Sequence, residues 1–329
     1  MITETNYNEL EAISEYLQKV PFDVTRRRLY SAADLYAGYH PGDDKSFDSC
    51  YDSVVYKTFM AKGVHAKDAR ETLARSLHDH NISLALDKFL KKRDPLLSVG
   101  IMGGHSLSRT DDMYRQTVII SKRLTEEGFL MLSGGGPGAM EATHLGAWMA
   151  GRSEDELDKA LEILQMAPCF KDKGWLYSAF EVMRRYPQTE YSSLGIPTWL
   201  YGHEPSTPFA THIAKFFQNC IREDDILTLA YGGIIYTPGS AGTMQEIFQD
   251  AVQNHYLSFG VSSPMAFMGK EFWTEQMPVY PLLQDLMASG RYKNLVLSLS
   301  DSAEDVVAEI LRFRDEQKAL KEEAKKIPF

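Results

Sequence analysis

The residues best suited to chemistry lie in one stretch, from Tyr231 to Glu246, which reads Tyr-Gly-Gly-Ile-Ile-Tyr-Thr-Pro-Gly-Ser-Ala-Gly-Thr-Met-Gln-Glu. Its pattern predicts a short buried strand over residues 233–236, a tight turn over 238–242 and a helix that starts near Thr243. A turn of small residues before a helix leaves backbone N–H groups free, and the helix dipole favours an anion there. The stretch therefore predicts a phosphate-binding loop made of Gly239, Ser240, Ala241, Gly242 and Thr243.

Glu246 follows this loop by about one helical turn, so its carboxylate would lie beside the bound anion. A carboxylate is a poor phosphate ligand, which indicates a separate chemical task. The segment also fits a purely structural explanation, because Thr243-Met-Gln-Glu246 has the spacing of a capping box, in which the glutamate only satisfies its own helix end. This segment alone does not decide between the two interpretations.

Composition narrows the class of protein. The chain has 329 residues, of which 44% are hydrophobic and 24% charged, as expected for a globular protein. A formal net charge of -10 argues against a nucleic-acid or anionic membrane partner. The 3 cysteines form no C-x-x-C pair, so neither a zinc site nor a disulfide framework is indicated. No signal peptide and no membrane-spanning run is recognisable, which favours a cytoplasmic setting.

Two further glycine clusters follow predicted strands. Residues 96–102 resemble a buried strand and precede Gly103, Gly104 and His105, whereas residues 129–132 precede a cluster with Gly134, Gly135 and Gly136. Helical patterns follow each cluster, and this β-α-β-α alternation predicts an α/β fold with a doubly wound parallel sheet. Ligands bind such sheets at the carboxyl ends of the strands, where both clusters lie.

Neither glycine cluster matches a known cofactor fingerprint. The G-x-G-x-x-G frame that starts at Gly136 fails at Glu141, and the frame that starts at Gly100 fails as well. The chain has no G-x-x-x-x-G-K-[ST] sequence, so the loop at Gly239 is not a Walker A loop. We therefore expect neither NAD binding nor ATP hydrolysis.

The predicted domain organisation has three parts. Residues 1–93 form a helical N-terminal extension that packs on the main domain or on a partner subunit, residues 94–316 form the α/β domain, and residues 317–329 form a charged tail. Within the main domain, residues 152–190 interrupt the alternation as an insertion. Residues 194–200, 264–268 and 295–298 resemble further strands, and residues 202–208 resemble a loop. The many apolar helix faces predict a homodimer or higher homo-oligomer.

The segment 209–222 has helical spacing and precedes the strand that leads to the Pro238 turn. Its polar residues follow an i, i+3, i+7, i+10 pattern, so we expect them to share one helix face, and they are His212, Lys215, Asn219 and Arg222. Such a face is usually solvated, but in this position it could also look into the ligand cleft.

Two segments together resemble the Lonely Guy (LOG) family. They are Ser133-Gly-Gly-Gly-Pro-Gly-Ala-Met-Glu141 and Pro238-Gly-Ser-Ala-Gly-Thr-Met-Gln-Glu246, which are similar to that family's G-G-G-x-x-G-x-M and P-G-G-x-G-T-x-x-E motifs. Ser133, Ala139 and Ser240 depart from the family pattern. The long insertion and the P-G-S-A-G-T sequence look closer to the bacterial pyrimidine/purine nucleotide 5′-monophosphate nucleosidases than to the plant cytokinin-activating members.

The resemblance implies a Rossmann-like fold and dimerisation, and the chemistry of the candidate residues requires no metal and no cofactor. It also implies hydrolysis of the N-glycosidic bond of nucleoside 5′-monophosphates, with free base and ribose 5-phosphate as products. By resemblance, Glu246 matches the catalytic glutamate and Arg222 the catalytic arginine. The substrate- and phosphate-binding residues would be Gly103, His105, Gly134, Gly135, Gly136, Met140 and the loop Gly239, Ser240, Ala241, Gly242 and Thr243.

The chemistry of these residue types agrees with such a reaction. A carboxylate stabilises an oxocarbenium-like sugar and activates water. Arginine does not deprotonate in proteins, so the proton for the leaving base must come from water or from another group, such as His105, His212 or Glu141. The alternative is a non-catalytic nucleotide sensor or carrier on the same fold. A pyridoxal-phosphate decarboxylase is disfavoured, because nothing marks a Schiff-base lysine.

Overall fold

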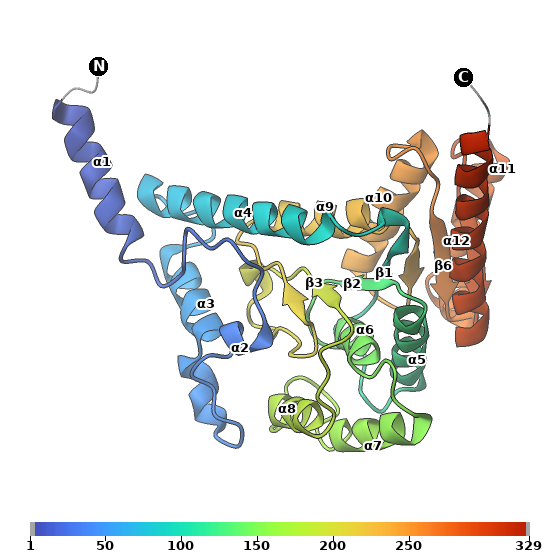
Figure 1. The fold of residues 1–329 in the computed structure, drawn as a ribbon, viewed down its shortest axis with the longest axis horizontal. Helices are drawn as coiled ribbons and strands as arrows, with labels where there is room; N and C mark the ends of the chain where they lie inside the picture. The colour runs from blue at the N-terminus through green and yellow to red at the C-terminus, as the bar shows by residue number, and fades with distance from the viewer. Residues whose placement is uncertain (1–3, 327–329) are drawn as a thin grey trace.

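The computed structural model describes residues 4–326. A parallel β-sheet of 7 strands, in the order β4-β3-β2-β1-β5-β6-β7, forms its centre (Figure 1). The strands are β1 (Ser98–Met102), β2 (Leu130–Ser133), β3 (Ser193–Gly195), β4 (His212–Ile213), β5 (Ile234–Tyr236), β6 (Pro264–Met268) and β7 (Val296–Ser300). The α/β doubly wound fold predicted from the sequence is therefore confirmed, and the architecture is Rossmann-like.

Helices lie on both faces of the sheet and at both of its ends (Figure 1). The helices are α1 (Glu4–Leu17), α2 (Ala32–Leu35), α3 (Tyr51–Lys62), α4 (Ala69–Leu90), α5 (Asp112–Glu126), α6 (Ala139–Trp148), α7 (Glu154–Leu164), α8 (Trp175–Arg185), α9 (Asn219–Leu229), α10 (Ala241–Tyr256), α11 (Val279–Ala288) and α12 (Ala303–Lys326). Short 3-10 helices are η1 (Asp44–Ser49), η2 (Pro95–Leu97) and η3 (Trp199–Tyr201), and η4 (Phe272–Gln276) is a π-helix.

The central strands are buried on both faces, and the alternation of their side chains explains how two helical layers pack against them. On β5, Ile235 packs with Val306 and Ile310 of α12, whereas its neighbours Ile234 and Tyr236 pack toward the opposite layer. That opposite layer contains α9 and α10 together with residues of the N-terminal region. Strands buried on both faces need a continuous apolar run, which is why the sequence pattern located them.

The N-terminal region packs directly against the sheet. Tyr30 forms an antiparallel bridge with Ile213 of β4, with N···O distances of 2.8 Å in both directions. Phe22, Val55 and Phe59 are buried in the same apolar cluster as the sheet residue Leu132. Residues before the first strand of the sheet thus complete one of its two cores, and α4 runs along this side of the molecule (Figure 1).

The segment 152–190 forms two helices, α7 and α8, which pack on α5 and α6 through a third apolar cluster. Arg109, in the loop after β1, joins this segment to the core. Its guanidinium donates hydrogen bonds to Glu141 of α6 at 2.9 and 2.5 Å, to the Ser178 hydroxyl of α8 at 2.8 Å and to the Ala167 carbonyl at 3.1 Å. Arg109 and Glu141 are both almost completely buried.

The helix predicted over residues 209–222 is wrong. Residues 212–213 form β4, and α9 begins only at Asn219. Contacts with distant segments prevent the helix from forming earlier. Lys215 is buried, and its ammonium lies 2.7 Å from the Asp52 carboxylate of α3. In addition, the Asp79 carboxylate of α4 accepts hydrogen bonds from the N–H groups of Phe217 and Gln218, at 3.0 Å in each case. These contacts hold the segment extended up to the start of α9.

Two local expectations also differ from the structure. The strand expected over residues 194–200 ends at Gly195, and the chain turns at Pro197 into η3, because proline cannot donate to a strand ladder. The helix α10 starts at Ala241 rather than near Thr243, with Ser240 as its N-cap and no side-chain cap hydrogen bond. The capping-box interpretation of Thr243 and Glu246 is therefore wrong.

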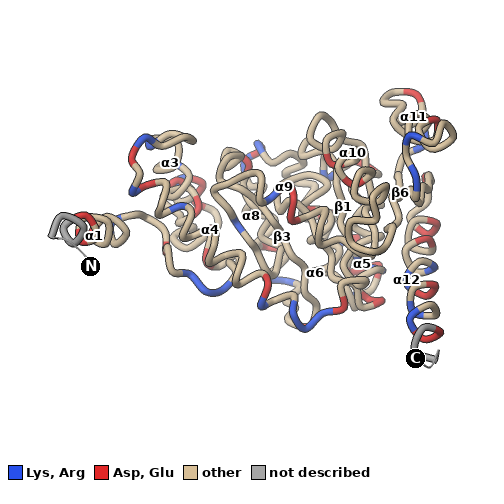
Figure 2. The backbone as a smooth tube through the Cα atoms, turned by 90° about the horizontal axis from the view of Figure 1, so that it is seen from above, with Lys and Arg blue, Asp and Glu red and all other residues tan. Residues whose placement is uncertain are grey.

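Charged residues are distributed along the whole backbone. Figure 2 shows lysines and arginines in short separate stretches rather than along one continuous face. Within residues 4–326, no helix is both long and apolar enough to cross a bilayer.

Candidate functional site

A cleft of about 500 Å³ lies at the carboxyl ends of β1, β2 and β5. The chain builds β1 to β4 in one direction and then returns to place β5 on the other side of β1. The loops after β1 and β5 therefore separate at this point, which is where open α/β sheets bind ligands. Ten of the residues proposed from the sequence line this cleft, and they are Gly103, His105, Gly134, Met140, Arg222, Ser240, Ala241, Gly242, Thr243 and Glu246.

The three remaining binding residues proposed from the sequence do not line this cleft. Gly135 and Gly136 line a smaller neighbouring cavity of about 30 Å³, which shares Gly134 and Arg222 with the cleft. Gly239 does not line the cleft. A side chain at Gly239 would meet the Thr243 hydroxyl at 2.2 Å, so this glycine allows the turn to pack onto the first turn of α10.

The first turn of α10 forms one side of the cleft. The N–H groups of Ala241, Gly242 and Thr243 belong to the first turn, so they have no acceptor within the helix. Ser240 does not cap them with its side chain. These donors and the positive end of the helix dipole together suit a phosphate group.

Arg222 of α9 lies between this helix and the loop after β2. Its Nη1 is 3.6 Å from Oε1 of Glu246, and both side chains are largely buried. A side chain at Gly134 would meet Nη2 of Arg222 at 2.5 Å, so only glycine leaves room for the guanidinium there. The sequence could not place Arg222 through a shared helix face, because His212 and Lys215 precede α9.

Contacts from α4 and from α10 fix the position of α9. Asp79 of α4 accepts the backbone N–H groups at the N-terminal end of α9, as described above. On the other side, the Gln245 side chain of α10 donates to Glu223 at 3.2 Å, and Gln249 donates to Asp224 at 3.1 Å. The guanidinium of Arg222 is thus positioned partly by a residue of the N-terminal region.

Burial raises the pKa of Glu246 to about 7, an increase that Arg222 opposes and Glu223 adds to. A carboxyl group that titrates near neutral pH is suited to proton transfer at that pH. The sequence identified this residue from its position after the loop, and the structure places it at the cleft wall beside a cation.

The raised pKa of Glu246 predicts a pH-dependent stability difference. The native state holds the proton more tightly than the unfolded chain, whose pKa is near the ordinary 4.5. This stabilisation is complete below the unfolded pKa and is lost as pH rises through about 7. Glutamine at position 246 does not titrate, so only the wild type loses this stabilisation. The unfolding free energy of Glu246→Gln, measured by urea denaturation, should therefore rise relative to that of the wild type by up to about 3 kcal/mol between about pH 5 and pH 8.

The exposed Glu162 of α7 provides the control for that measurement. Glu162→Gln should change the unfolding free energy by less than about 0.5 kcal/mol at both pH values. A constant difference between Glu246→Gln and the wild type across this pH range would show that Glu246 does not titrate as described.

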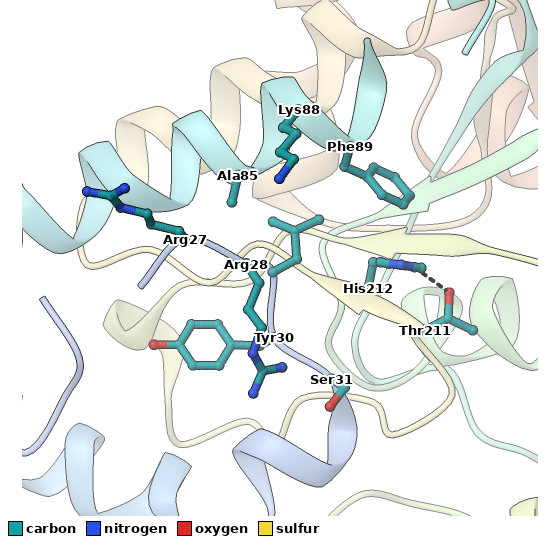
Figure 3. Close-up of a pocket in the computed structure, with 10 residues that line it drawn as sticks. Arg27, Arg28, Tyr30, Ser31, Ala85, Lys88, Phe89, Thr211 and His212 are labelled. Carbon is teal, nitrogen blue, oxygen red and sulfur yellow. Dashed lines mark hydrogen bonds between the residues drawn. The ribbon is translucent and has the colours of Figure 1, made fainter. Parts of the chain in front are cut away.

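Two proton donors considered from the sequence lie outside the cleft. Glu141 is completely buried and is bound by Arg109 and by the Tyr114 hydroxyl at 2.8 Å. His212 belongs to a separate cavity of about 420 Å³ beside α4, where its ring lies 4.3 Å from that of Phe89 (Figure 3). That cavity contains no glycine loop and no carboxylate, so it lacks the chemistry of the main cleft.

The cleft also contains residues that sequence reasoning missed, namely Tyr201, His203, Glu204, Glu223 and Gln245. The segment 202–208 resembled an ordinary loop, and no spacing linked it to the glycine motifs. Only the pairing of β3 beside β2 brings this loop to the cleft. Among residues 4–326, no group of three or more histidine, cysteine or acidic side chains could hold a metal ion.

Comparison with known proteins gave matches to structures only. No protein-family model matches the chain, and no curated protein matches it. The molybdenum cofactor binding protein from the phototrophic bacterium Rippkaea orientalis matches with a TM-score of 0.40 and 16% identity, over 67% of this chain and 98% of that one. The Chlamydomonas rheinhardtii Moco carrier protein matches with a TM-score of 0.39 and 14% identity, over 66% and 96%. At these scores the likeness decides neither ligand nor activity.

Proposed function

We propose that the cleft binds a nucleoside 5′-monophosphate and hydrolyses its N-glycosidic bond, releasing free base and ribose 5-phosphate. The observation that carries this proposal is the buried carboxyl group of Glu246, which titrates near neutral pH beside Arg222 and one turn from the open end of α10. The resemblance of the two glycine motifs to the LOG family agrees with it.

In this reaction the first turn of α10 holds the 5′-phosphate, so that the ribose is fixed relative to Glu246. As the C1′–N bond lengthens, the sugar acquires oxocarbenium character, which the Glu246 carboxylate stabilises while it takes a proton from the attacking water. Arg222 lies beside Glu246, and its positive charge keeps the Glu246 carboxyl group ionised in a fraction of the molecules despite its burial. It also supplies a cation to the phosphate or ribose oxygens.

A non-catalytic nucleotide carrier is the second candidate, and the same pKa favours it. With a pKa of about 7, roughly half of the Glu246 carboxyl groups are neutral near neutral pH. A neutral carboxyl group donates a hydrogen bond to a ligand but does not stabilise an oxocarbenium ion. Tight nucleotide binding without release of base from any nucleoside monophosphate in a panel would establish the carrier and exclude the hydrolase.

The phosphate contact predicts a sharp substrate preference. AMP and CMP should release base, whereas adenosine and cytidine should not, because the N–H groups of the α10 first turn then have no anion to bind. Chromatographic detection of free base from each of the four compounds measures this. Equal turnover of adenosine and AMP would contradict a phosphate-binding role for residues 240–243.

A further inference from the structure

Release of a base anion from ribose requires a proton, and the cleft must provide its donor. Arg222 does not deprotonate, and Glu246 accepts a proton from water in the proposed reaction. Glu141 and His212 lie outside the cleft, as described above. His105, in the loop after β1, is the donor considered from the sequence that does line the cleft.

His105 is one of three ionisable side chains grouped on this wall. Oε1 of Glu204 lies 3.7 Å from Nδ1 of His105 and 3.7 Å from Nε2 of His203. The Glu204 side chain is 16% exposed, whereas those of His105 and His203 are 49% and 60% exposed. A shielded carboxylate thus faces two solvent-accessible imidazoles, and all three line the cleft that contains Glu246.

We propose that His105 donates the proton to the leaving base and that Glu204 is the positioning residue that holds its imidazolium. This inference rests on the proposed hydrolysis. Because Nδ1 of His105 faces Glu204, its other nitrogen, Nε2, is the one left to reach a ligand. A carboxylate at one ring nitrogen orients the imidazole and its other nitrogen, as in other acid–base pairs with histidine.

The remaining neighbours of His105 do not compete for its proton. The Phe170 ring, from the loop before α8, meets the imidazole edge to face with centroids 6.1 Å apart, and Lys171 lies over the Phe170 ring. His203 contacts Glu204 through Nε2, so its free nitrogen is Nδ1, the one nearer its own backbone. The geometry therefore favours His105 over His203.

The proposed step balances. The C1′–N bond breaks and its electron pair stays on the base, while Nε2–H of the His105 imidazolium gives its proton to a base nitrogen. A water oxygen bonds to C1′ and loses a proton to Glu246. The base leaves neutral, His105 becomes a neutral imidazole, and exchange with solvent returns the proton from Glu246 to His105.

A change of leaving group tests this assignment. The full-length protein is assayed with AMP and with the p-nitrophenyl β-riboside 5-phosphate, whose nitrophenolate leaves without protonation. His105→Gln should lower kcat for AMP by about 10²–10⁴-fold, because a general acid contributes this much. Its kcat for the nitrophenyl substrate should stay within about threefold of the wild type, which also shows that the variant folds. Glu204→Gln should show a smaller selective loss.

The exposed His80 of α4 gives the matched control, and His80→Gln should keep wild-type rates on both substrates. Equal loss on both substrates in His105→Gln, or no loss on either, overturns the assignment. A selective loss in His203→Gln but not in His105→Gln assigns the donor to the other imidazole and also overturns it. If the wild type releases base from no nucleoside monophosphate in a panel that includes AMP and CMP, the hydrolase proposal itself fails, a result distinct from all of these.

Discussion

Glu246→Gln is expected to release base from AMP at least about a hundredfold more slowly than the wild type, because general-base assistance is worth roughly 10²–10⁴-fold. The glutamine preserves the size of the side chain but removes the negative charge that faces the developing oxocarbenium ion. The substitution should not destabilise α10, since Glu246 does not cap this helix. Nucleotide binding should persist, because the α10 first turn is unchanged. Rates of base release and nucleotide affinity, measured on the same sample, test this prediction.

The control for this measurement is Glu162→Gln, which removes an exposed carboxylate on α7 and should leave turnover unchanged. Wild-type turnover in Glu246→Gln would exclude Glu246 as a catalyst. The stability and activity predictions can be combined. At about pH 8, Glu246→Gln should be more stable than the wild type but should release base much more slowly. A residue kept for folding would show the opposite combination.

Arg109→Met is expected to lower the free energy of unfolding by about 3–5 kcal/mol, because it leaves the Glu141 carboxylate buried without its partner. The guanidinium also satisfies the Ser178 hydroxyl and the carbonyls of Ala167 and Trp175, which would lose a donor. These contacts connect α7 and α8 to the loop after β1. Urea denaturation monitored by tryptophan fluorescence measures the loss.

The exposed pair Arg115–Asp158, with an N···O distance of 2.6 Å, offers a comparison of the same chemistry at the surface. Arg115→Met should cost about 0–1 kcal/mol, because solvent screens exposed ion pairs. Replacing Arg109 by Met and Glu141 by Leu together should recover part of the loss, since no charge then remains buried. Equal costs for Arg109→Met and Arg115→Met would contradict this account.

The sequence was sufficient for the central strands of the sheet, because each of them is a largely apolar run followed closely by glycine or proline. This pattern located β1, β2, β5 and β6, and it also located β7 within about two residues. It failed for the segment 209–222, where a helical spacing of polar residues arises by chance. The buried contact between Lys215 and Asp52 joins residues 163 positions apart, which local periodicity does not reveal.

The cleft was partly predictable for a similar reason. The loops after strands carry glycine and proline, so their residues stand out even without knowledge of the strand order. Glu204 lacks such a signal, because it follows a short strand and a 3-10 helix and meets His105 only in the folded chain. Asp79 is still harder to find, since its partners are backbone N–H groups of a distant segment.

The glycines around the cleft should be replaced by other residues at different rates in evolution. A methyl group at Gly239 would collide with Thr243, so the fold itself selects for glycine there. At Gly242, by contrast, a methyl group would meet no atom of the protein within 4 Å and would project into open space at the wall of the cleft. In a lineage that lost the ligand but kept the fold, Gly242 should therefore be replaced early and Gly239 should persist. Substitution at position 242 would then indicate loss of ligand binding, whereas substitution at position 239 would indicate a change in the fold.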